Sequence, residues 1–92
     1  MAVNTFRRAD NIGVRRVGDE IFILAPDGDL VVLGNETAVF LWEAVEDGAT
    51  TSEELASRLC ETYEVSPAQG RQDALDFERT LSERSVLVAV AK

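Results

Sequence analysis

The 92-residue sequence contains no histidine and only one cysteine, Cys60. The lack of histidine removes the commonest general base and the commonest metal ligand, and a single thiol cannot form an internal disulfide. No apolar run approaches the roughly 18 residues of a membrane-spanning helix, and the N-terminus lacks the apolar segment of a signal peptide. We therefore expect a cytoplasmic protein that holds no metal or cofactor and does not contact a membrane.

Recognisable catalytic sets are also missing from the sequence. The six glycines are too scattered to cradle a phosphate. Asp73 and Asp76 lie one turn apart on a predicted helix, where a solvated face is a far commoner explanation than a catalytic pair. Cys60 falls on the inward stripe of another predicted helix and is expected to be a small buried hydrophobe. The sequence thus predicts no catalytic residues, and we do not expect an enzyme.

The formal net charge of −8 disfavours binding to nucleic acid or to anionic membranes. The positive charges gather near the start of the chain, at Arg7, Arg8, Arg15 and Arg16. Residues 1–12 are therefore expected to form a flexible basic N-terminal arm, and residues 13–92 a single domain.

Apolar runs separated by turn residues predict an α+β fold that begins with a three-stranded antiparallel meander. The expected strands are Gly13–Val17, Glu20–Ala25 and Leu30–Leu33. Three helices should follow, with Asn35, Thr51 and Ser66 as their N-cap residues, and a short strand within Val86–Val90 should end the chain. Their inward-facing stripes are expected to be Ala38, Leu41, Trp42 and Val45, then Leu55, Ala56, Leu59, Cys60 and Tyr63, then Ala74, Phe77 and Leu81.

The second and third predicted strands are unusual because they are apolar on both faces. An antiparallel sheet with one wet face should alternate apolar and polar residues. The spare apolar face could be covered by the N-terminal arm, by the C-terminal strand or by a second copy of the chain. Alternatively, an exposed strand edge beside apolar side chains could accept a strand from another chain.

The third predicted helix carries a mixed face beside its core stripe, formed by Arg71, Leu75, Glu78, Arg79 and Ser82. Apolar and charged groups together suit a groove for a peptide, although an ordinary amphipathic rim has the same pattern.

The run VLGNETAVFLWEAVEDGATTSEELASRLCETYEV, followed by DALDFERTLSERSVL, resembles the coenzyme PQQ synthesis protein D (PqqD) family. Three features depart from the family pattern. Gly34 separates Leu33 from Asn35, where the family has Leu directly before Asn, Glu78 stands where the family has Leu, and Ser85 stands where it has Gly. The residues that fit the signature are Leu33, Asn35, Thr37, Ala38, Leu41, Trp42, Asp47, Gly48, Thr51, Glu54, Leu55, Tyr63, Asp73, Phe77, Leu81 and Leu87.

The resemblance implies a winged-helix-like peptide-recognition domain, known as a RiPP recognition element, for ribosomally synthesised precursor peptides. Such a non-catalytic chaperone binds the leader of the precursor as an added strand and presents it to a modifying enzyme. That enzyme is a radical-SAM protein in the PQQ pathway, and related stand-alone domains serve lasso-peptide and similar pathways. Carried over to this sequence, the arginines would pair with acidic leader residues. The implied peptide-binding residues are Leu30, Val31, Val32, Leu33, Arg71, Leu75, Glu78 and Arg79.

Two other functions are compatible with the same elements. A winged-helix fold could bind DNA, but the segment from Pro67 to Arg84 has three arginines against four carboxylates, a net charge of −1. The apolar strands could instead form a homodimer interface in a small dimerisation module.

Overall fold

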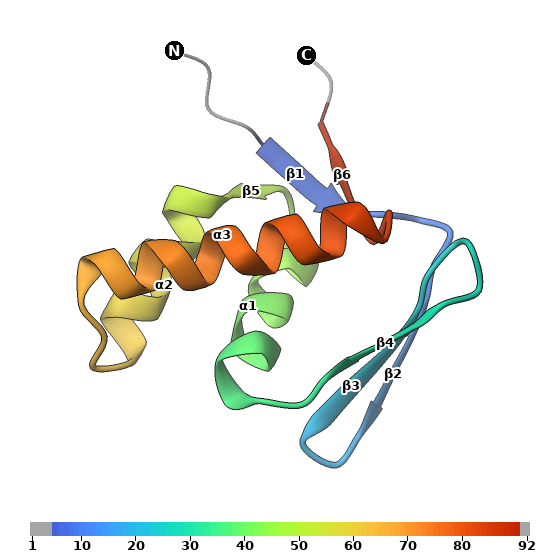
Figure 1. Ribbon diagram of the computed structural model, residues 1–92, viewed down its shortest axis with the longest axis horizontal. Helices are drawn as coiled ribbons and strands as arrows, with labels where there is room; N and C mark the ends of the chain where they lie inside the picture. The colour runs from blue at the N-terminus through green and yellow to red at the C-terminus, as the bar shows by residue number, and fades with distance from the viewer. Residues whose placement is uncertain (1–4, 91–92) are drawn as a thin grey trace.

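The computed structural model describes residues 5–90, which form two small antiparallel sheets and three helices (Figure 1). One sheet has the strand order β2–β3–β4 and the other has the order β5–β1–β6. In chain order the elements are β1 (Thr5–Arg8), β2 (Gly13–Val17), β3 (Glu20–Leu24), β4 (Leu30–Leu33), α1 (Glu36–Glu46), β5 (Thr50–Thr51), α2 (Ser52–Thr62), α3 (Pro67–Glu83) and β6 (Leu87–Ala89).

The predicted meander is confirmed as the sheet β2–β3–β4, and its two turns explain the sequence between the strands. Gly18 and Gly28 adopt φ angles of 61° and 95°, a left-handed conformation that suits glycine because it has no Cβ. The Ala25 N–H donates to the Asp29 carbonyl at 2.8 Å and closes the hairpin between β3 and β4. Each turn therefore fixes the register of the two strands that it joins.

The three predicted helices and their N-caps are also confirmed. The side chains of Asn35, Thr51 and Ser66 accept hydrogen bonds from backbone N–H groups three residues further on, at 2.8 to 3.1 Å. Trp42 is completely buried at the centre of the core. The stripe of α3 points inward as expected, since Ala74, Phe77 and Leu81 are buried.

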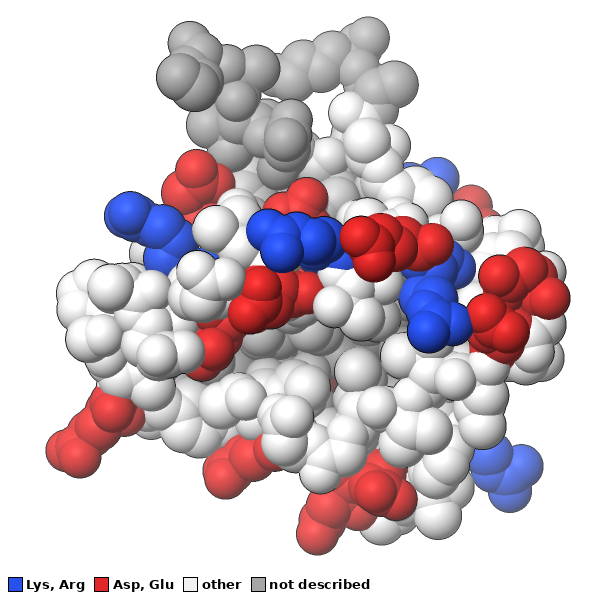
Figure 2. Space-filling model, viewed as in Figure 1, with Lys and Arg blue, Asp and Glu red and all other residues white. Residues whose placement is uncertain are grey.

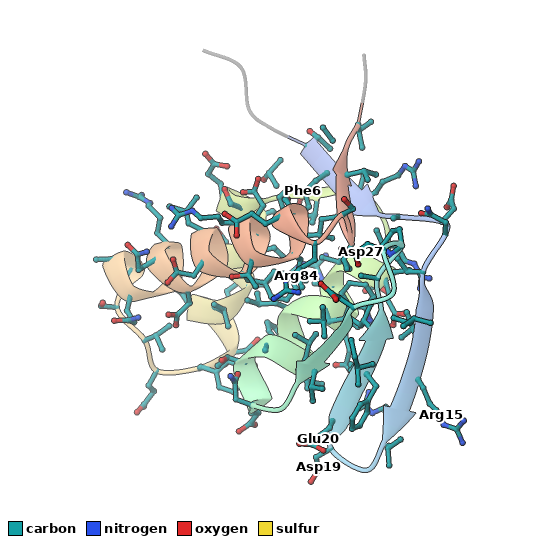
Figure 3. The ribbon with its side chains drawn as sticks, turned by 45° about the vertical axis from the view of Figure 1, so that its right-hand side comes forward. Phe6, Arg15, Asp19, Glu20, Asp27 and Arg84 are labelled. Carbon is teal, nitrogen blue, oxygen red and sulfur yellow. The ribbon has the colours of Figure 1, made fainter. Side chains whose placement is uncertain are left out.

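The expectation of a flexible arm over residues 1–12 is wrong for the part that the structure describes. Thr5–Arg8 form β1, the central strand of the second sheet, and pair with both β5 and β6. The side chain of Phe6 is 3% exposed and joins the main core (Figure 3). Burial of this aromatic ring stabilises the strand. Residues 1–4 of the expected arm lie outside the described part of the chain.

The outer face of the sheet β2–β3–β4 is apolar and exposed, as the sequence pattern suggests. Val17, Leu24, Leu30 and Val32 lie on this face and are 46 to 60% exposed. Neither the N-terminal segment nor the C-terminal strand covers it, because β1 and β6 form the other sheet. Within the described residues, neither the N-terminal segment nor the C-terminal strand therefore shields this apolar face. Coverage by a second copy of the chain, in a homodimer, stays a prediction.

The chain turns sharply after α3 at Ser85, which adopts a φ of 62°. This left-handed conformation is unfavourable for a residue with a Cβ and accounts for the glycine expected at the corresponding family position. Within residues 5–90, no helix is both long and apolar enough to span a bilayer.

Candidate functional site: a free strand edge beside α3

Strand β4 has one free edge, because β3 is its only partner within residues 5–90. Opposed residues of an antiparallel pair alternate between those that exchange hydrogen bonds and those that do not. The bond from Ala25 to Asp29 sets this alternation, so Val31 and Leu33 direct their backbone groups toward β3. The backbone groups of Leu30 and Val32 consequently point outward and are available to another strand.

The free edge of β4 borders a groove whose opposite wall is α3. The groove has a volume of about 330 Å³. Leu33 contributes from β4, and Phe77 and Leu81 contribute from the inward stripe of α3. In Figure 2 a recess lies between α3 and the sheet, with acidic side chains along the α3 side. Its lining residues are Leu33, Asn35, Thr37, Ala38, Leu41, Asp73, Asp76, Phe77, Thr80 and Leu81.

An ion pair joins the end of α3 to the β3–β4 turn. Arg84 Nη1 lies 2.8 Å from Asp29 Oδ2. Figure 3 shows Arg84 beside this turn. The pair is about half exposed and so contributes little to stability.

The structure does not bring the eight predicted peptide-binding residues together. The four residues of β4 lie on the free-edge strand, with Leu30 and Val32 exposed, Val31 half-buried and Leu33 buried. Leu75, Glu78 and Arg79 line a separate hollow along α3, and Arg71 lines another beside α2. None of these four helix residues lines the groove that borders β4.

The face of α3 that carries Leu75 and Glu78 does not line the groove beside β4, for a geometric reason. The two faces of α3 lie on opposite sides of its inward stripe. Glu78 is on the side nearer α2, where partial burial and the neighbouring Glu53 carboxylate raise its pKa. The opposite side, which carries Asp73, Asp76 and Thr80, meets the groove.

The groove residues of α3 were missed because the sequence pattern shows a helix's inward stripe but not which flank meets the sheet. A weak signal was nevertheless present. Asp73 and Phe77 are both among the positions that fit the family signature, and they lie one turn apart on the groove side of α3.

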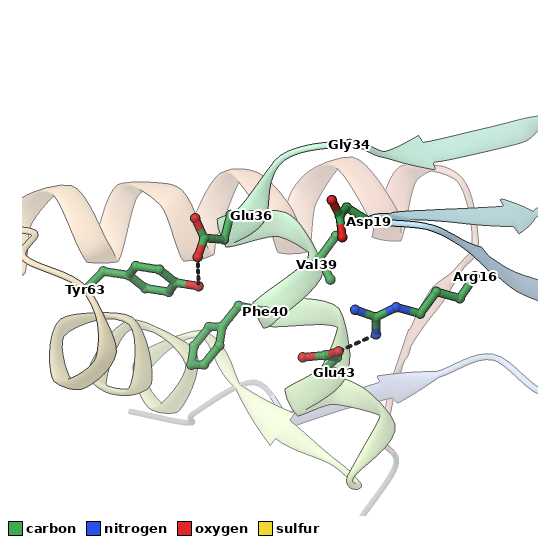
Figure 4. A pocket seen from close by; sticks show the side chains of 8 residues that line it. All are labelled: Arg16, Asp19, Gly34, Glu36, Val39, Phe40, Glu43 and Tyr63. Carbon is green, nitrogen blue, oxygen red and sulfur yellow. Dashed lines mark hydrogen bonds and ion pairs between the residues drawn. The ribbon is translucent and has the colours of Figure 1, made fainter.

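A second, more polar cavity of about 530 Å³ lies between the β2–β3 turn, α1 and the end of α2 (Figure 4). Arg16 donates a hydrogen bond to Glu43 there. This hydrogen bond, together with the electrostatic attraction of the Glu43 carboxylate, raises the pKa of Arg16. The Tyr63 hydroxyl donates a hydrogen bond to Glu36 at 3.4 Å. Desolvation raises the pKa of Tyr63, and the negative charge of Glu36 raises it further. These contacts tie the sheet to the helices, and no residue predicted to bind peptide lines this cavity.

The described residues offer no obvious place for a metal ion, since residues 5–90 contain no suitable group of three or more acidic or thiol side chains. Cys60 is half-buried, and its thiol lies 3.8 Å from the Ser66 carbonyl. What the site presents is a row of backbone donors and acceptors beside an apolar groove, which is the geometry of peptide recognition by strand addition.

A free strand edge facing a helix-lined groove defines a small α+β domain of the peptide-recognition class. The family comparison is more specific, since residues 20–87 match the model for coenzyme PQQ synthesis protein D. The chain belongs to the PqqD family. A search of curated protein sequences gave no significant match.

Two solved structures resemble the fold closely. TbiB1, solved in complex with the TbiA(beta) leader peptide, has a TM-score of 0.80 and 24% identity, with 94% of this chain and 99% of that chain covered. Lasso peptide synthetase B1, complexed with the leader peptide, has a TM-score of 0.76 and 24% identity, with 90% of this chain and 96% of that chain covered. The similarity extends over nearly the whole of all three chains, further than the family match over residues 20–87.

Proposed function

We propose that this protein binds the leader segment of a ribosomally made precursor peptide as an additional strand on β4. The observation that carries the proposal is the free edge of β4 beside the groove of α3. The outward backbone groups of Leu30 and Val32 would bond to the leader. Alternate leader side chains would then face the groove, because successive residues of a strand point to opposite faces.

The proposed role is that of a non-catalytic peptide chaperone. Family membership supports it, and so do the two similar proteins that were solved with leader peptides bound. The protein would hold the leader while a separate enzyme modifies the rest of the precursor. A radical-SAM enzyme is the proposed partner if the chain serves PQQ synthesis, and another modifying enzyme if it serves a related pathway.

A DNA-binding function fits the surface charge less well. The exposed part of α3 includes Asp76 and Glu83, and Arg79 and Arg84 are each within 4 Å of a carboxylate. A helix that enters the major groove of DNA instead needs free positive charge to contact phosphates. Peptide binding is therefore the function that we propose.

Titration of the ¹⁵N-labelled protein with candidate leader peptides, followed by NMR, tests the proposal. The amides of Leu30 and Val32 should shift on binding, together with the amides around Phe77. Strand β2 at the opposite edge also has β3 as its one partner within residues 5–90, so the amides of Val14 and Arg16 serve as internal controls and should not shift. Shifts confined to β2, or to the hollow around Leu75, would exclude the proposed site.

A further inference from the structure

The groove beside β4 combines an apolar floor with two carboxylates and contains no basic residue. Its floor is formed largely by the side chains of Leu33, Leu41 and Phe77, and all three are buried in the free protein. Asp73 and Asp76 lie above this floor on the middle part of α3. The lining is therefore apolar at its base and negatively charged on the α3 side (Figure 2).

The two carboxylates are only weakly compensated within the protein. Asp73 Oδ1 accepts a hydrogen bond from the Gln69 amide at 2.8 Å, and Asp76 Oδ1 accepts one from the Gln72 amide at 2.9 Å. These neutral partners leave the negative charges in place. Within residues 5–90, the one cation that pairs with either group is Arg79, whose Nη1 is 3.9 Å from Asp76 Oδ1 in an exposed pair that contributes little.

Strand geometry determines which part of a bound peptide would reach these carboxylates. On β4, Val31 and Leu33 face the inner side of the sheet, whereas Leu30 and Val32 face the outer side. A peptide strand paired with β4 has the same alternation. One inner side chain of the peptide would thus lie beside Leu33 and enter the groove.

Resting on the proposed function, we infer that the peptide side chain beside Leu33 is a lysine or arginine. Its aliphatic stem would lie on the apolar floor at Phe77, and its charged head would reach Asp73 and Asp76. Long basic side chains bury their stems in this way while the charge stays near water or a carboxylate. In this inference the protein supplies the carboxylates and the peptide supplies the positive charge. The sequence led to the opposite expectation, in which arginines of the protein pair with acidic residues of the leader.

A display selection tests this inference without requiring a known leader sequence. A library of random 12-residue peptides is selected against the wild-type protein and against the double variant Asp73→Asn/Asp76→Asn. The matched control is Glu61→Gln/Glu64→Gln, which changes the net charge equally at exposed positions outside the groove. Selected peptides are synthesised, and their loss of affinity for Val32→Pro identifies those that bind at β4.

The expected result is enrichment of lysine or arginine at one position of the β4-binding peptides. Replacing that residue with glutamine should weaken binding about fivefold to the wild-type protein and to the Glu61/Glu64 control, but not to the Asp73/Asp76 variant. Raising the salt concentration should reduce this difference.

Other outcomes separate the inference from the function on which it rests. If the peptides bind at β4 but show no basic preference, or lose affinity equally in the control variant, the inference is wrong and the proposed function stands. If no selected peptide depends on Val32, strand addition at β4 fails and the inference fails with it.

Discussion

A proline at position 32 should abolish much of the peptide affinity without unfolding the protein. The Val32 N–H points away from β3, so Val32→Pro removes a donor from the free edge and none from the β3–β4 ladder. The peptide loses one backbone hydrogen bond, and its carbonyl is left without a donor. Together these effects should cost about 2 kcal/mol of binding free energy, or roughly 30-fold in Kd.

The opposite edge of the same sheet supplies a matched control. The pairing register directs the Val14 N–H on β2 away from β3, as it does the Val32 N–H on β4, so Val14→Pro removes one backbone donor from the other free edge. Isothermal titration with a leader peptide should give equal affinities for Val14→Pro and the wild-type protein. Circular dichroism would verify that both variants are folded. Equal weakening by the two prolines, or none by Val32→Pro, would refute strand addition at β4.

Four substitutions away from the free edge test the account of the fold by denaturant unfolding. Phe6→Ala should lower the free energy of unfolding by about 3 kcal/mol, whereas a residue on a flexible arm would have almost no effect. Ser85→Gly should raise it by about 0.5–1 kcal/mol because it relieves the left-handed φ of 62°. Gly70→Ala should lower it by about 1–3 kcal/mol, since the added Cβ would lie 2.9 Å from Cys60 Sγ, and adding Cys60→Ala should restore part of the loss. Glu78→Gln should raise the free energy of unfolding at pH 7 by about 0.3 kcal/mol, with no gain below pH 4. Because the pKa of Glu78 is higher in the folded protein than in the unfolded chain, ionisation of this carboxyl destabilises the folded state as the pH rises above the unfolded pKa.

Local signals were sufficient to predict the meander, the helices and their caps. Gly18, Gly28 and the N-cap residues each satisfy a requirement set by their near neighbours, and so they can be recognised in the sequence. The strand β1 could not be recognised in this way. Its four residues, Thr5–Arg8, contain one apolar side chain, and its partners Thr50 and Ala89 lie more than 40 positions away.

The candidate site was only half predictable for a related reason. The excess apolarity of Leu30–Leu33 indicated an exposed strand, and four exposed apolar side chains on the outer sheet face agree with that interpretation. The groove-facing flank of α3 depends instead on how the helix packs against α2 and the sheet. Leu75 and Asp76 are adjacent in sequence, yet they line different hollows.

The pairing of β1 with β6 places the two ends of the described chain together. The Val90 N–H donates to the Thr5 carbonyl at 2.9 Å, and Figure 1 shows both strands on the opposite side of α3 from β4. A fluorescent protein or affinity handle attached at either end would therefore leave the free edge of β4 uncovered. A short linker between the ends would also allow circular permutation, with new termini opened at the exposed turn around Gly48.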